Sequence, residues 1–243
     1  MLKDQVKKML HSVGIYKHYH FLRYVLKYKI KSWFSPDHSF YTLSPPLLLA
    51  INASLKKAQE LNILEGTDYM EFGLFRGFSF WYTQAAAKEA GIADMHYYGF
   101  DSFKGLPEVY DPEFSTGDFE CGRDVVEENL TKFGVDWEKT FLIEGFYSNS
   151  LNAHTRSQYD FRKCAICVID CDLYDAAKDV LEFITPMLNQ TCFLIFDDWN
   201  CYDADDDKGE RKAFAEFIEK NHNLKVEDYG QFGHNCKVFL LKK

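Results

Sequence analysis

The chain of 243 residues contains no apolar run long enough to cross a bilayer. Its longest apolar stretches, residues 164–169 and 192–196, are far shorter than the ~18 to 20 residues that a membrane-spanning helix needs. Residues 1–10 also lack the continuous apolar block of a secretory signal, because lysines are interspersed with the apolar side chains. We therefore expect a cytoplasmic protein without a transmembrane segment.

Long low-complexity tracts and internal repeats are absent too, and the seven cysteines are an odd number. Most of these cysteines lie inside apolar runs, where a free thiol packs as a small hydrophobic side chain, so a reducing compartment fits best. A composition of 47% hydrophobic and 27% charged residues excludes a disordered, collagen-like or disulfide-stapled chain. It suits one large domain, or a domain with an appendage.

The charge is unevenly distributed along the chain. Residues 1–31 carry eight Lys or Arg against the single acid Asp4, whereas the net charge of the whole chain is −9. Such a basic arm could meet an anionic partner, a membrane surface or a second subunit, although a solvated face of amphipathic helices explains it more simply. The acidic remainder argues against a nucleic-acid partner, because phosphate neutralisation needs clustered Lys and Arg.

Helical patterns dominate the first quarter of the sequence. Residues 2–33 have helical spacing, and Ser44 before Pro45 and Pro46 predicts a helix start that continues to Leu61. We expect residues 1–65 to form an N-terminal helical cap that could also provide homodimer contacts. The second domain would then comprise residues 66–243.

Short apolar runs alternate with helical patterns through the rest of the chain, which predicts an α/β fold with a mostly parallel sheet and helices on both faces. No helix separates the last two runs, so they should form an antiparallel hairpin at one edge. The seven expected strands are residues 69–72, 96–100, 140–143, 164–169, 192–196, 224–228 and 237–241.

The ends of the first two strands favour a nucleoside-containing cofactor. Ligands of open parallel sheets bind beyond the carboxyl ends of the strands. Gly73 follows the first strand and would let a ligand approach the backbone, and Gly77 would let helix and strand pack closely, although the dinucleotide spacing Gly-x-Gly-x-x-Gly is missing. Asp101 ends the second strand 28 residues after Gly73, where it could accept hydrogen bonds from ribose hydroxyls or simply cap the following turn.

Carboxylates follow the fourth and fifth strands. Asp170 and Asp172 come after one, and Asp197 and Asp198 come after the other. Adjacent parallel strands end at the same level about 4.8 Å apart, so these side chains should converge. Their mutual repulsion would be relieved by a hard divalent cation, for which Mg²⁺ is the natural candidate. The alternative is that each acid caps a helix and binds nothing.

Four blocks of the sequence resemble the signature blocks of the macrocin O-methyltransferase (TylF/MycF-type) family. These blocks are Glu71–Gly77, the Phe-Asp-Ser-Phe-Lys-Gly-Leu-Pro run of residues 100–107, the Asp-Cys-Asp-Leu-Tyr run of residues 170–174, and Asp197 with Asp198. The family consists of S-adenosylmethionine-dependent enzymes that methylate sugar hydroxyls on natural products. The resemblance runs from about Asp68 to the C-terminus. It implies a Rossmann-like class I methyltransferase fold with a seven-stranded, mostly parallel sheet and an antiparallel C-terminal strand.

The resemblance also implies a role for particular residues. Asp170, Asp197 and Asp198 would bind Mg²⁺. Two positions depart from the pattern: Cys171 replaces a usual Gly, and Leu173 stands where related catechol-type enzymes have a Lys base. The residues expected to bind S-adenosylmethionine are Glu71, Phe72, Gly73, Arg76, Gly77, Ser79, Asp101, Ser102, Phe103, Gly117, Asp118, Glu144, Gly145, Phe146 and Asp170.

The leading hypothesis is a Mg²⁺-dependent O-methyltransferase acting on a small-molecule hydroxyl of a sugar or glycoside. His234 in the final hairpin, or Asp198, would accept the proton, although His234 could equally be a surface turn residue. The alternatives are a nucleotide-dependent oxidoreductase or sugar-nucleotide enzyme, and a non-catalytic module that binds a metal or a nucleoside. Cys164 and Cys167 have zinc-like spacing, but strand positions three apart should point to opposite faces and so cannot share a metal.

Overall fold

The computed structural model describes residues 26, 28, 30, 40, 41 and 44–243. The helices predicted over residues 2–33 therefore lie almost entirely outside the described residues, although residues 26, 28 and 30 are helical. Pro46–Lys243 is one structural unit, and the sheet lies within it. In the described part of the chain, no helix combines the length and the apolar character needed to span a membrane.

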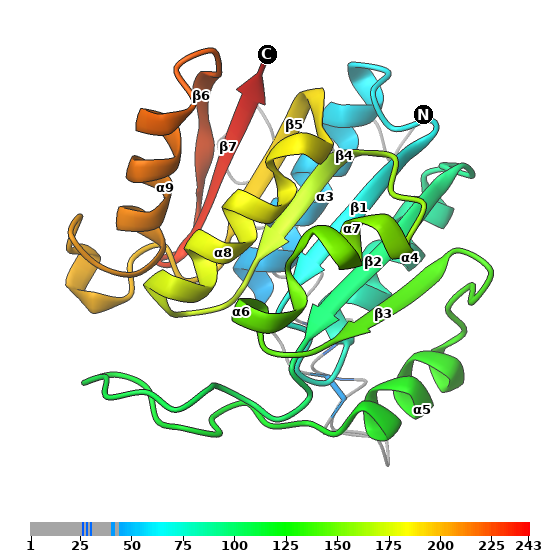
Figure 1. Cartoon of the computed structure of the whole chain (residues 1–243). Coiled ribbons are helices and arrows are strands. Elements are labelled where there is room, and N and C mark those ends of the chain that lie inside the picture. The colour runs from blue at the N-terminus through cyan, green and yellow to red at the C-terminus, as the bar shows by residue number, and fades with distance from the viewer. Residues whose placement is uncertain (1–25, 27, 29, 31–39, 42–43) are drawn as a thin grey trace. The chain divides into compact units, whose positions relative to one another are not determined.

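Seven strands form a single sheet in the order β3-β2-β1-β4-β5-β7-β6 (Figure 1). The first five strands pair in parallel, and β7 pairs antiparallel with both β5 and β6. This topology confirms the predicted mostly parallel sheet with an antiparallel hairpin at one edge. The strands are β1 (Thr67–Phe72), β2 (Met95–Asp101), β3 (Thr140–Glu144), β4 (Lys163–Ile169), β5 (Leu188–Phe196), β6 (Lys225–Phe232) and β7 (Cys236–Lys242).

Helices cover both faces of the sheet (Figure 1). On one face lie α3 (Pro45–Glu60) and α4 (Phe78–Glu89), and α5 (Arg123–Phe133) packs against α4. Helix α3 begins at the predicted Ser-Pro-Pro signal. On the other face lie α6 (Tyr147–Ser150), α7 (Ala153–Gln158), α8 (Tyr174–Ile184) and α9 (Gly209–Lys220), and the 3₁₀ turns are η1 (Thr185–Met187) and η2 (Tyr202–Ala204).

The central strands are buried on both faces, which explains why they read as continuous apolar runs. Every residue of β1 is buried, as are the last five residues of β5. On the α8 side of the sheet, Phe72 stacks on Phe100 with ring centroids 4.3 Å apart, and Phe183 packs edge-on against both rings. Much of the high aromatic content of the chain is therefore core packing.

A β-bulge at Ala165 changes the direction of the cysteines in β4. The pairing of β4 with both β1 and β5 passes from Cys164 to Ile166 and skips Ala165. The extra residue shifts the two-residue period, so Cys164 and Cys167 point to the same face and into one core cluster. The prediction that these two side chains point to opposite faces was therefore wrong. All seven cysteines are free thiols.

Candidate functional site

The register of the parallel strands brings four strand ends to one level. Phe72 lies opposite Phe100 on one side and Ile169 on the other, and Ile169 lies opposite Phe196. The predicted site residues therefore meet at the carboxyl edge of the sheet, as expected for parallel strands. The residues that immediately follow these four are Gly73, Asp101, Asp170 and Asp197.

Gly73 is required by the crossing of two backbone segments. Its φ is +90°, and a Cβ at this position would lie 1.8 Å from the carbonyl oxygen of Asp170. The tight contact is therefore with the segment that follows β4. Gly77 also has a positive φ, and its Cβ would meet the side chains of Leu130 and Val126 in α5. The close packing expected between helix and strand at Gly77 is thus a contact between two helices.

Asp101 holds the loop after β1 against the end of β2. One carboxylate oxygen accepts hydrogen bonds from the backbone amides of Leu74 (2.7 Å) and Phe75 (3.1 Å), and the other accepts one from Phe103 (2.7 Å). Burial raises the pKa of Asp101, and these amides oppose that rise. The turn-capping alternative is therefore present in the structure. The oxygen that accepts only the amide of Phe103 keeps a second lone pair, so a ribose hydroxyl remains compatible with these contacts.

Glu71 lies in the interior between β1 and α4. Its carboxylate accepts hydrogen bonds from Ser79 (2.6 Å) and from the hydroxyl of Tyr69. Thr83 in turn donates to Tyr69. Burial raises the pKa of Glu71 to about 7. Glu71 and Ser79 thus fix the start of α4 beside the loop that contains Gly73.

Other predicted cofactor residues surround the ends of β2 and β3. Ser102 donates to the carbonyl of Gly105 (2.7 Å), and Glu144 forms an ion pair with Arg123 (3.5 Å). The amide of Gly145 donates to the carbonyl of Asp101 (2.9 Å), which ties the ends of β2 and β3 together. Phe146 is the residue before the first turn of α6.

Arg76 and Phe72 differ in how much of the side chain a ligand could contact. The guanidinium of Arg76 lies over the ring of Phe75, 4.8 Å from its centroid, and the residue is partly exposed. Phe72 is fully buried in the core, so only its backbone faces the strand end. Phe103 is also buried, and the guanidinium of Arg123 lies 5.8 Å from its ring centroid.

The long loop between β2 and α5, residues 102–122, meets the segment after β5. The hydroxyl of Tyr202 donates to Asp111 (2.9 Å), and its ring meets Phe114 edge-on at 5.9 Å. Gly117 and Asp118 lie in the same loop, where the carbonyl of Asp118 accepts the amide of Leu106. No sequence pattern indicated the contact between Tyr202 and Asp111, because these residues are 91 positions apart.

Backbone strain is concentrated in these loops. The residue Tyr202 and its two successors all have φ near +60°, a conformation that costs an L-residue roughly 1 to 2 kcal/mol. Such strain persists where surrounding contacts impose it, and it is frequent at functional sites. Apart from Asn62, the described non-glycine residues with positive φ all lie beyond the carboxyl ends of strands: Phe75, Phe103, Phe119, Asp172, Tyr202, Asp203 and Ala204.

The carboxylates after β4 and β5 converge, as predicted. Asp170, Asp172 and Asp198 lie close enough for the charge of Asp198 to raise the pKa of the other two carboxyl groups. Burial, followed by the charge of Asp198, raises the pKa of Asp172 to about 9. Burial and the charge of Asp197 likewise raise the pKa of Asp170 well above its usual value. Burial, followed by the charge of Asp197, raises the pKa of the Cys236 thiol in β7.

Glu210 is a member of this acidic cluster that the sequence analysis missed. It lies in the first turn of α9 and is 1% exposed. One of its oxygens accepts the backbone amide of Asp198 (3.2 Å). The other oxygen is buried without a hydrogen-bond partner, as is Oδ2 of Asp198. An acid in the first turn of the helix that follows the fifth strand is the signal that could have identified it.

The donor chemistry of the cluster suits a divalent cation. Among the described residues, no three Asp, Glu, His or Cys side chains are arranged as a metal site. Carboxylate oxygens are nevertheless the donors that Mg²⁺ and Ca²⁺ prefer. Two buried oxygens without partners are also what an absent cation would leave behind.

His234 lies in the exposed turn between β6 and β7, at the same edge of the sheet. Its backbone carbonyl accepts hydrogen bonds from the side chains of Asn200 (2.5 Å) and Gln231 (2.6 Å). The amide of Trp199 donates to Asn235 (3.1 Å), so the segment after β5 is fastened to the hairpin. The role of the His234 imidazole as a base remains a prediction.

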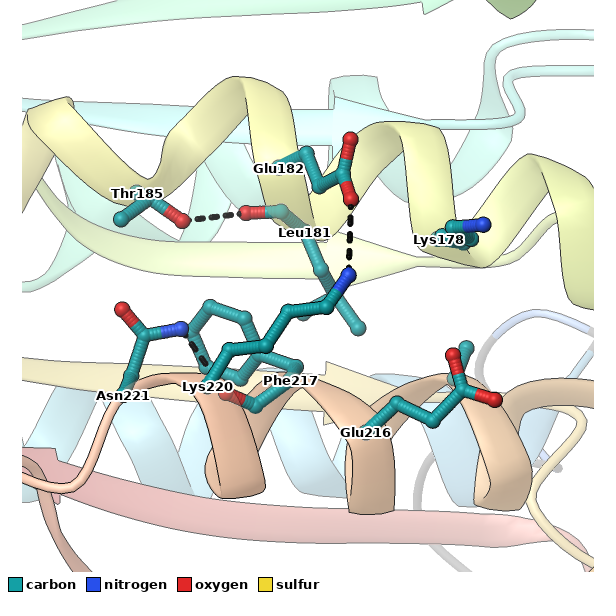
Figure 2. A pocket seen from close by; sticks show the side chains of 9 residues that line it. Lys178, Leu181, Glu182, Thr185, Glu216, Phe217, Lys220 and Asn221 are labelled. Carbon is teal, nitrogen blue, oxygen red and sulfur yellow. Dashed lines mark hydrogen bonds and ion pairs between the residues drawn. The ribbon is translucent and has the colours of Figure 1, made fainter.

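A shallow groove between α8 and α9 is separate from this edge (Figure 2). Leu181 and Phe217 provide apolar surface, and an ion pair between Lys220 and Glu182 (3.2 Å) crosses it. Its space of about 30 Å³ accommodates roughly one water molecule. The groove is therefore a seam of helix packing and contains none of the predicted site residues.

Comparison with known proteins agrees with this arrangement. The chain is 26% identical over 166 residues to the 8-demethyl-8-(2,3-dimethoxy-alpha-L-rhamnosyl)-tetracenomycin-C 4'-O-methyltransferase of Streptomyces olivaceus, covering 63% of this chain and 62% of that protein. It is 24% identical over 144 residues to the mycinamicin III 3''-O-methyltransferase of Micromonospora griseorubida, covering 54% and 55%. The matches thus span less than two thirds of these relatives.

Solved structures share the fold. The O-methyltransferase NovP superposes with a TM-score of 0.66 at 17% identity, covering 82% of this chain and 80% of NovP. The calicheamicin methyltransferase CalS11 superposes with a TM-score of 0.61 at 20% identity, covering 79% and 77%. The model of the macrocin-O-methyltransferase (TylF) family matches residues 51–227. The chain therefore belongs to the macrocin-O-methyltransferase (TylF) family.

Proposed function

We propose that this protein is an S-adenosylmethionine-dependent O-methyltransferase that methylates a hydroxyl of a sugar or glycosylated small molecule. The observation that carries the proposal is the meeting of two features at one sheet edge. The loop after β1, held by Asp101, lies beside the carboxylate cluster of Asp170, Asp197 and Asp198. Ligands of open parallel sheets bind beyond the carboxyl ends of the strands, so a cofactor and an acceptor could bind side by side at this edge.

The acceptor class is taken from the relatives. The names of the two relatives from Streptomyces and Micromonospora both specify O-methyl transfer. The name of the Streptomyces relative includes a rhamnosyl group on tetracenomycin C. Family membership over residues 51–227 covers every strand from β1 to β5 that contributes to the site. We extend the same reaction class to this chain, with a sugar hydroxyl as the acceptor.

The cofactor would lie along the ends of β1, β2 and β3. Asp101 would hold the ribose through the one lone pair that its three amide contacts leave free, on the oxygen that accepts the amide of Phe103. Glu71 and Ser79 would fix the loop after β1 at the methionine end of the cofactor. Arg76 lies in this loop and would pair with the carboxylate of the methionine group. The reactive methyl group, bonded to a sulfonium, needs an acceptor oxygen in line with it, so the main task of these residues is orientation.

Mg²⁺ would be held by Asp170, Asp197 and Asp198. Cys171 stands where the family usually has Gly, and Leu173 stands where related catechol-type enzymes have a Lys base. When bound, the cation would act as a Lewis acid that lowers the pKa of the acceptor hydroxyl. Asp198 or His234 would accept the hydroxyl proton. Asp198 is supported by its place in the cluster, and His234 by the attachment of its turn to the segment after β5.

Residues 1–65 would form a helical cap or extension and would supply homodimer contacts, with residues 66–243 forming the methyltransferase domain. We place the protein in the cytoplasm, where S-adenosylmethionine and reducing conditions for its free thiols are both available.

The experiment is transfer of a labelled methyl group from S-adenosylmethionine to a panel of rhamnosides, other glycosides and phenols, each with Mg²⁺ or with EDTA. Asp170→Asn and Asp198→Asn test the site, and Glu219→Gln on the exposed side of α9 is the charge-matched control. We expect a labelled, O-methylated glycoside with the wild type and the control, and a loss of at least about 100-fold with the site variants. Transfer to none of the acceptors by a wild type that binds the cofactor would contradict the proposed acceptor class.

A further inference from the structure

Glu210 is buried among other acids, and it forms no ion pair with a basic residue in the described part of the chain. Its strongest electrostatic neighbours are Asp198, Asp172 and Asp197, all of the same charge sign. A carboxyl group that is 1% exposed and carries a partnerless oxygen is costly unless something binds that oxygen. The position of Glu210 therefore requires an explanation beyond packing.

The basic residue next in sequence does not supply the missing charge. The guanidinium of Arg211 forms an ion pair with Asp206 (2.6 Å) and donates to the side chain of Asn200 (3.0 Å). It also lies 5.2 Å from the ring centroid of Trp199. These contacts direct Arg211 along the segment after β5, away from the partnerless oxygen of Glu210.

The two oxygens of Glu210 have different surroundings. Oε2 accepts the backbone amide of Asp198, so Glu210 fixes the backbone that carries one proposed cation ligand. Oε1 is buried and without a partner, and so is Oδ2 of Asp198 in the same cluster. Two such oxygens on residues joined by a hydrogen bond match the hard donors of a divalent-cation site.

We propose that Glu210 supplies a further carboxylate to the divalent-cation site of Asp170, Asp197 and Asp198. This inference rests on the cation in the proposed function and adds a ligand from α9 that neither the family pattern nor the sequence analysis assigned. The competing explanation is a buried, protonated acid that only supports the loop after β5.

The test is titration of the whole chain with Mn²⁺, without cofactor or acceptor. Binding is measured by calorimetry and by electron paramagnetic resonance, which detects the free ion. Glu210→Gln keeps an oxygen that can accept the Asp198 amide but removes the charge. Glu219→Gln, exposed on the same helix, is the matched control. We expect Glu210→Gln to weaken Mn²⁺ binding at least tenfold and Glu219→Gln to stay within twofold of the wild type.

Unchanged Mn²⁺ affinity in a folded Glu210→Gln variant would overturn the inference, as would a wild type that binds no Mn²⁺. Thermal unfolding establishes that each variant is folded. If Glu210→Gln does not fold, Glu210→Asp replaces it, because this variant keeps the charge but moves it back by one methylene group. Its affinity for Mn²⁺ should also fall, and an unchanged affinity would overturn the inference. Binding of S-adenosylhomocysteine, measured on the same samples, separates this failure from failure of the methyltransferase proposal.

Discussion

The carboxylate of Asp101 accepts a hydrogen bond of 2.7 Å from the backbone amide of Leu74, so the end of β2 holds the loop that follows β1. The same oxygen also accepts the amide of Phe75. A residue singled out as a candidate ribose ligand is thus first a structural partner of the cofactor loop. Its two roles can be separated by experiment.

Replacing Asp101 should affect folding and cofactor binding together. Asp101→Ala leaves the amides of Leu74, Phe75 and Phe103 without their acceptor, which should lower the free energy of unfolding by about 1 to 3 kcal/mol. Asp101→Asn keeps one carbonyl oxygen and should lose less. Urea unfolding measures this difference, with Glu128→Ala on the exposed face of α5 as the control. An Asp101→Ala variant as stable as the wild type would contradict the structural role.

Gly73→Ala should be among the most damaging single-methyl changes in the chain. The added Cβ would lie 1.8 Å from the carbonyl oxygen of Asp170, so β1 and β4 could not both keep their positions. We expect a loss of more than about 2 kcal/mol in the free energy of unfolding. Gly91→Ala is the matched control, because Gly91 also has a positive φ but nothing within 4 Å of its Cβ. Equal losses in the two variants would show that φ alone sets the cost.

Tyr202→Phe should impair acceptor use while leaving cofactor binding unchanged. The variant loses the hydrogen bond to Asp111 that joins the two loops beyond the strand ends, at a cost of about 1 kcal/mol in stability. Steady-state kinetics should show a several-fold rise in KM for the acceptor, with the Kd of S-adenosylhomocysteine within twofold of the wild type. Tyr110→Phe serves as the control, because Tyr110 is 97% exposed on the loop that contains Asp111. An unchanged KM for the acceptor would contradict a role of Tyr202 in acceptor binding.

Asp68 should make the protein less stable as the pH rises from about 4 to about 7. Burial raises the pKa of Asp68 from 3.8 to about 7 in the folded state, so the unfolded chain releases this proton first. The unfolding free energy then falls across this window by at most about 4 kcal/mol and stays lowered above it. Asp68→Asn should remove that fall in urea unfolding series between pH 4 and pH 8.

Asp94→Asn should change the pH dependence of the unfolding free energy in the opposite direction, because it removes a contribution that grows as the pH rises. Its hydrogen bond with Arg162 lowers the pKa of Asp94, so the wild-type residue stabilises the fold above its ordinary pKa and loses that effect as the pH falls. Pairing these two variants guards against a general effect of removing a negative charge. A fall of unchanged size in Asp68→Asn would refute the assignment to Asp68.

The sequence predicted features that depend on local pattern. The Ser-Pro-Pro start of α3, the seven strands and the hairpin without an intervening helix all follow from residue spacing. Convergence of Asp170 with Asp197 also followed, because parallel strands in register must end together.

The features that escaped prediction depend on irregular or distant contacts. The bulge at Ala165 reversed the expected direction of Cys167, because the alternation of strand side chains holds only where the pairing is regular. Glu210 resembles an ordinary acid of an amphipathic helix until its burial is known. The bond from Tyr202 to Asp111 joins two loops without repeating pattern.

The most direct test of the central claim is calorimetric titration of S-adenosylhomocysteine into the wild-type protein and Asp101→Ala, with and without Mg²⁺. We predict micromolar binding to the wild type, about −8 kcal/mol, and a loss of at least tenfold in Asp101→Ala. Asp170→Ala should retain binding if its carboxylate serves mainly the cation. Absence of binding to the wild type with or without Mg²⁺ would contradict the methyltransferase account.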